Sequence, residues 1–89
     1  MMSARRLKIM LICDEYAKLQ EEHRAWHSIL EEHLGKKAKA PDGNRIETPY
    51  AIIDFVISQP IYTSGYKLIL KCGENDERVL SLATGEESL

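Results

Sequence analysis

The sequence predicts a single α+β domain over residues 1–89, in which a long N-terminal amphipathic helix packs on a small antiparallel β-sheet ending in a C-terminal hairpin. Three observations predict this class. The chain has 89 residues, and two domains would each be too small to hold a core. Large side chains recur at helical spacing in the first third of the chain. Short alternating runs bounded by turn residues fill the second half.

A helical stripe begins near residue 9. Large side chains recur at alternating three- and four-residue steps, at Ile9, Ile12, Tyr16, Leu19, His23, Trp26, Leu30 and His33. This stripe is widened on one flank by Ala17, Ala25, Ile29 and Leu34, and a glycine follows it as a natural stop. We therefore predict a helix over about residues 9–34. The alternative is a short strand that ends at Cys13 and a helix that starts after Asp14, because apolar and polar side chains also alternate before that point.

Residues 35–47 are predicted to form a basic loop. They contain three lysines, a proline and the turn signal Asp42-Gly43, with almost nothing to bury. The loop separates two parts of different charge. Residues 1–45 carry nine Lys and Arg against seven Asp and Glu, whereas residues 46–89 carry three against seven.

The stretch from residue 48 to residue 84 is predicted to be rich in β-structure. Its most apolar run, residues 50–57, is dominated by Ile and Val and alternates like a strand buried on one face and half-buried on the other. We favour a strand there. Thr48 followed by Pro49 is also a good helix start, so a helix is the alternative for this run.

The last part of the chain predicts a hairpin. Alternating residues 66–72 and 78–83 are joined by the four polar residues 73–76, as in two paired strands. A helix from Asp76 to Thr84, capped by an asparagine and ended by a glycine, is the weaker alternative. Residues 85–89 are predicted to be an acidic tail.

Composition and the N-terminal segment predict a cytoplasmic globular protein. Hydrophobic residues make up 44% and charged residues 29%, with a net charge of −2, which is typical of globular domains. The apolar run at residues 9–13 is shorter than the roughly 7–15 residues of a secretion signal. No run approaches the roughly 18 apolar residues of a membrane span. Cys13 and Cys72 could pair in principle, but in this compartment we expect them to be buried free thiols.

The residues show no constellation typical of catalysis. His23 and His27 stand four apart, followed by Glu31, and could face a divalent cation. The motif lacks the glutamate that follows the first histidine of metalloprotease helices, and the remaining ligands would have to come from elsewhere. Every histidine lies on the predicted helix, and both cysteines fall at predicted buried positions. We therefore expect no enzyme activity, no metal and no cofactor.

Protein–protein interaction is the function that the pattern favours. A sheet of about three strands cannot cover a helix of about 25 residues, so part of the stripe should be left for a partner. We expect a small adaptor or inhibitor whose partner is another protein, and a homodimer. The predicted interface residues are Tyr16, Leu19, His23, Trp26 and Leu30, in which buried aromatic side chains would contribute most of the binding energy.

Weak nucleic-acid binding is the alternative function. The basic residues that could contact phosphates are Arg5, Arg6, Lys8, Lys36, Lys37, Lys39 and Arg45. The predicted hairpin loop carries Glu74, Asp76 and Glu77, which would repel a phosphate backbone. Binding of this kind is therefore expected to be weak and sensitive to salt.

Overall fold

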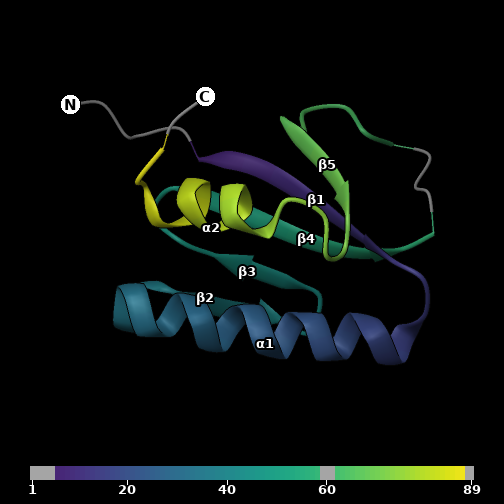
Figure 1. Ribbon diagram of the computed structural model, residues 1–89, viewed down its shortest axis with the longest axis horizontal. Coiled ribbons are helices and arrows are strands. Elements are labelled where there is room, and N and C mark those ends of the chain that lie inside the picture. The colour runs from purple at the N-terminus through teal and green to yellow at the C-terminus, as the bar shows by residue number, and fades with distance from the viewer. Residues whose placement is uncertain (1–5, 59–61, 88–89) are drawn as a thin grey trace.

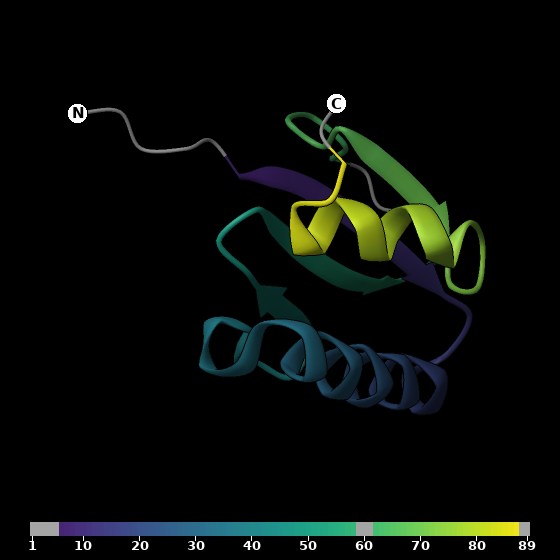
Figure 2. The same ribbon diagram turned by 60° about the vertical axis from the view of Figure 1, so that its left-hand side comes forward.

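Both helices lie on one face of a five-stranded sheet (Figures 1 and 2). We describe residues 6–58 and 62–87 in a computed structural model. In chain order the elements are β1 (Leu7–Cys13), α1 (Tyr16–Leu34), the 3₁₀ helix η1 (Gly35–Lys37), β2 (Lys39–Asp42), β3 (Arg45–Glu47), β4 (Ala51–Ile57), β5 (Leu68–Lys71) and α2 (Asp76–Thr84). The predicted α+β class is confirmed.

The sheet is mixed rather than antiparallel. Its strand order is β2-β3-β4-β1-β5, and β1 runs parallel to both of its neighbours. Leu7 pairs with Ala51 at one end of the β1–β4 ladder, and Cys13 pairs with Ile57 at the other. The prediction of an antiparallel sheet is wrong because β1 inserts between β4 and β5, which are neighbours in the sequence. Within residues 6–58 and 62–87, antiparallel pairing is confined to β2, β3 and β4.

The first element is a strand, so the alternative for the N-terminal segment is confirmed and the helix from residue 9 is wrong. β1 is central in the sheet, and Ile9, Met10 and Leu11 are all buried. A central parallel strand is buried on both faces, which favours a continuous apolar run. Glu15 has an extended backbone, and α1 begins directly after it.

The predicted basic loop contains structure of its own. After η1, strands β2 and β3 form a short hairpin that turns at Gly43 and Asn44. Ile46 on β3 is fully buried, whereas every residue of β2 is exposed. β2 is an edge strand without a buried face, so it has no hydrophobic alternation by which the sequence could reveal it.

The prediction of a C-terminal hairpin is also wrong. The weaker alternative, a helix over residues 76–84, is confirmed. After β5 the chain turns through residues 72–75 and enters α2. Val79, Leu82 and Ala83 are buried at helical spacing. Gly85 ends the helix with a φ of 83°, a left-handed conformation that glycine adopts without strain. The strand prediction for residues 50–57 is confirmed by β4.

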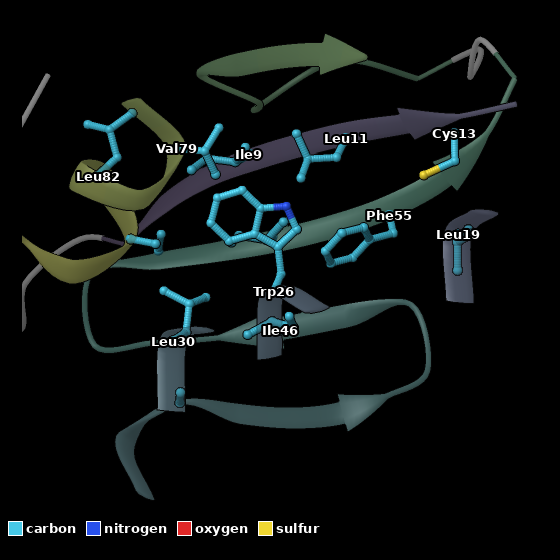
Figure 3. Packing of buried hydrophobic residues seen from close by; sticks show 14 residues of the cluster. Ile9, Leu11, Cys13, Leu19, Trp26, Leu30, Ile46, Phe55, Val79 and Leu82 are labelled. Atoms are coloured by element: carbon cyan, nitrogen blue, oxygen red, sulfur yellow. The ribbon is translucent and has the colours of Figure 1, made fainter. Parts of the chain in front are cut away.

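The core lies between the helices and the sheet (Figure 3). Trp26 and Leu30 of α1 point toward the sheet, where Ile9, Phe55 and Ile46 point back at them (Figure 3). Val79 and Leu82 bring α2 into the same cluster. One continuous core therefore holds both helices to one face of the sheet.

Cys13 and Cys72 are joined by a disulfide, so the prediction of free thiols is wrong. Cys13 ends β1, and Cys72 directly follows β5, which pairs with β1. This pairing brings the two Cα atoms to 5.5 Å although the cysteines are separated by 59 positions. That distance lies within the usual range for disulfides.

Within residues 6–58 and 62–87, no helix combines the length and the apolar character needed to cross a membrane.

Candidate functional site

A groove of about 230 Å³ runs between α1 and α2, and we call it the helix groove. Its lining residues come from both helices and are Glu22, Ala25, Trp26, Ile29, Asp76, Glu77 and Leu80. The two helices lie side by side in both views (Figures 1 and 2). Trp26 is only 5% exposed and packs in the core, so it gives the groove a fixed floor. Ile29 is 38% exposed on the wall of the groove.

The polar lining of the helix groove is acidic. Asp76 and Glu77 occupy the first turn of α2, where the positive end of the helix dipole favours carboxylates. Among the residues that the structure describes, neither makes an ion pair with a basic side chain. Glu22 of α1, in contrast, makes an ion pair, because its Oε2 atom lies 3.7 Å from Lys18 Nζ. The groove therefore combines apolar walls with two carboxylates that no lysine or arginine of the described chain neutralises.

Three of the five predicted interface residues belong to the core of the single chain. Leu19, Trp26 and Leu30 are all buried against the sheet or α2. The expectation that the helix stripe is left uncovered is wrong for them, because they pack in one cluster with side chains of β1, β3, β4 and α2. Tyr16 is 62% exposed. It lines a second, more open cleft of about 480 Å³ beside the carboxyl end of β4.

His23, the fifth predicted interface residue, attaches α1 to β3, and His27 attaches it to the residue before β2. The His23 Nε2 atom lies 3.0 Å from the carbonyl oxygen of Arg45, and the His27 Nε2 atom lies 3.2 Å from that of Ala38. Each ring nitrogen donates to its carbonyl, so it is not free to bind a cation. No three His, Cys, Asp or Glu side chains in the described ranges are placed to hold a metal ion.

Asp54 forms a charged network on the face of the sheet opposite the helices. Its Oδ1 atom accepts a hydrogen bond of 2.7 Å from Arg45 Nε, and its Oδ2 atom accepts one of 2.6 Å from the Tyr66 hydroxyl. The hydrogen bond and the charge of Asp54 raise the pKa of Arg45. Burial, followed by the hydrogen bond to Asp54, raises the pKa of Tyr66 to about 12. Asp54 therefore joins Arg45 of β3 to Tyr66, which precedes β5, as is typical of a structural network.

The basic residues predicted for nucleic-acid binding separate into three groups. Arg6, Lys37 and Lys39 surround one hollow of about 380 Å³. Lys8 lies over the Tyr66 ring, with its Nζ atom 4.6 Å from the ring centroid, and Arg45 is committed to Asp54. Lys36 is exposed on η1, and Arg5 lies outside the described residues.

The sequence contained a partial signal for the helix groove. Four residues were expected to widen the helical stripe on one flank; two of them, Ala25 and Ile29, line the groove, and Ala17 and Leu34 do not. Leu80, Asp76 and Glu77 were missed because their segment was expected to be a hairpin. A helix places Asp76, Glu77 and Leu80 on one face, since residues three and four apart are neighbours there.

Comparison with protein-family models, with curated proteins and with solved structures finds no match for this chain.

Proposed function

We propose that this protein is a non-catalytic binding module that holds a basic amphipathic helix of another protein in the helix groove. The observation that carries the proposal is the combination of exposed apolar side chains with unneutralised carboxylates in one groove. Each half of this combination selects a property of the guest. The apolar part selects a hydrophobic face, and the carboxylates select lysine or arginine beside that face.

The apolar contribution comes from residues that a guest can cover without rearranging the core. Ile29 is exposed, and Ala25 lies one helical turn before it on the same face of α1. Leu80 faces them from α2 and is half-buried. Removing this surface from water stabilises a complex by about 25 cal/mol for each Å² of apolar area. Trp26 below it is already packed, so the floor does not have to be ordered when the guest binds.

The charge contribution favours a basic guest over an acidic one. A lysine or arginine placed beside Asp76 and Glu77 would pair with carboxylates that lack a basic partner among the described residues. Exposed ion pairs each contribute about 0.2–1 kcal/mol. They contribute more to the choice of partner and to the rate of association than to affinity. An acidic helix of the same hydrophobicity would be repelled.

The shape of the groove supports a helical guest. The helix groove is a depression lined on one side by α1 and on the other by α2. A third helix fits such a depression by presenting side chains at positions i, i+3 or i+4, and i+7. Homodimerisation stays a separate prediction. If a second copy of this chain occupied the groove, self-association would compete with the guest.

A synthetic 18-residue helix of leucine and lysine, labelled with a fluorophore, is a suitable probe. We expect its anisotropy to rise on binding, and a peptide with glutamate in place of every lysine not to bind. Ile29→Ser should weaken binding about tenfold, equivalent to 1.4 kcal/mol. Ile69→Ser is the matched control, because Ile69 is also 38% exposed but lies on β5.

A second pair of variants tests the charges. Glu77→Gln should weaken binding and reduce its dependence on salt, whereas Glu32→Gln, which changes an exposed carboxylate of α1 outside the lining, should change neither. Equal affinity of Ile29→Ser and Ile69→Ser would overturn the proposal. So would light scattering that shows a dimer which Ile29→Ser dissociates, because the groove would then hold a second copy.

A further inference from the structure

A second candidate binding site lies in the hollow that Arg6, Lys37 and Lys39 surround, which we call the basic hollow. Glu47, Thr48 and Pro49 complete its lining. The six residues come from three separate parts of the chain: the residue before β1, the η1–β2 segment and the end of β3 with the turn that follows it. The helix groove shares none of these residues, so the two sites are independent.

The framework of the basic hollow is fixed by hydrogen bonds. Lys39 of β2 is the register partner of Glu47 in β3. Arg6 Nη1 donates to Glu47 Oε1 over 3.4 Å. Thr48 is buried, and its hydroxyl donates to the carbonyl oxygen of Ala83 over 2.8 Å. The cations are therefore brought together by the sheet and its turn, and the buried Thr48 hydroxyl is already used within the fold.

The residues that line the basic hollow carry a net charge of +2. Its lining contains three cations, Arg6, Lys37 and Lys39, and one carboxylate, Glu47. Glu47 also lies 3.6 Å from Arg45, so two guanidinium groups already neutralise it. Within residues 6–58 and 62–87, Lys37 and Lys39 make no ion pair.

We infer that the basic hollow binds a terminal phosphate group, the dianion of a phosphomonoester or of inorganic phosphate. Two uncompensated positive charges match the two negative charges of the dianion, which a phosphomonoester becomes above its second pKa of about 6. Inorganic phosphate is mainly the dianion at pH 7.5. A phosphodiester linkage carries only one negative charge. Lys37 and Lys39 act as point charges on the phosphate, and the N–H groups of Arg6 that do not contact Glu47 add donors beside them.

The test is a titration followed by ¹H–¹⁵N NMR at constant ionic strength, with inorganic phosphate as the first probe. We expect the amide signals of Lys37, Lys39 and Glu47 to shift at pH 7.5 and the affinity to fall at pH 5, where phosphate loses one charge. Sulfate, which keeps two negative charges at both pH values, should bind at both. An absence of shifts with either anion overturns the inference.

The double variant Lys37→Ala/Lys39→Ala should bind phosphate about tenfold more weakly. The double variant Lys67→Ala/Lys71→Ala is the matched control, because it also removes two exposed lysines but outside the hollow. Equal loss in both variants would show a response to net charge alone and would contradict a site.

Two eight-residue thymidine oligonucleotides, one with a 5′-phosphate and one without, distinguish the sources of the phosphate. Preference for the phosphorylated oligonucleotide supports recognition of a nucleotide end, and binding of inorganic phosphate without either oligonucleotide supports a small phosphate compound. Equal binding of both oligonucleotides overturns the inference, because it shows contact with the phosphodiester backbone.

Discussion

Replacement of Trp26 by alanine tests whether this residue belongs to the core of one chain or to an interface between two. Trp26 is 5% exposed and points from α1 toward the sheet, between Leu30 and the side chains of β1 (Figure 3). These contacts are all made within a single chain. The fold therefore predicts that the substitution destabilises the monomer itself.

The size of the effect follows from the volume removed. Truncation of a buried tryptophan to alanine costs about 3–5 kcal/mol. A chain of 89 residues has a free energy of unfolding of about 4–13 kcal/mol. The variant is therefore expected to lose about a quarter of its stability or more, although the disulfide still constrains the unfolded chain.

Urea unfolding followed by far-UV circular dichroism is the appropriate assay, because Trp26 is the only tryptophan and its loss removes the fluorescence signal. Trp26→Phe should cost less, since most of the aromatic volume remains. Tyr16→Ala, at an exposed position on the same helix, should change stability by no more than about 0.5 kcal/mol. A loss below about 1 kcal/mol for Trp26→Ala, or one that changes with protein concentration, would refute the assignment to the core.

Three further predictions concern the polar groups. Asp54→Ala should cost about 2–3 kcal/mol in urea unfolding, less than a fully buried pair because Arg45 is partly exposed; a cost near zero would show that the network does not stabilise the fold. Because the pKa of Tyr66 is raised from 10.0 to about 12, its contribution to stability is complete below pH 10 and is lost as the pH rises toward 12. The difference in absorbance at 295 nm between the native protein and Tyr66→Phe should show this step, and a step near pH 10 would contradict it. Thr48→Val should cost about 1–3 kcal/mol because the buried carbonyl of Ala83 loses its donor, and an unchanged melting temperature would contradict the assigned bond.

Local patterns predicted the elements that have a buried face of their own. β4 was expected from its Ile- and Val-rich alternation, and α1 from its helical stripe, although its start was placed too early. At β1, alternation and helical spacing were both present, and the burial of both faces of a central strand decided between them. Val79, Leu82 and Ala83 fit the helical period of α2, but the same segment also alternates.

The parts that sequence patterns did not predict depend on contacts between distant residues. Leu7 pairs with Ala51, and Cys13 bonds Cys72, but local periodicity contains no information on such partners. The helix groove depends in the same way on α2 packing beside α1. Charge alone could not have separated Lys37, which lines the basic hollow, from basic residues committed elsewhere.

The position of the bound probe is the most direct test of the helix groove as the functional site. Nuclear Overhauser effects should be measured between the leucine methyl groups of the leucine–lysine peptide and the methyl groups of this protein. We expect contacts to Ile29 and Leu80, on the two walls of the groove. Contacts to Ile69 on β5 or to Ile57 at the end of β4, without contacts to Ile29 and Leu80, would contradict it.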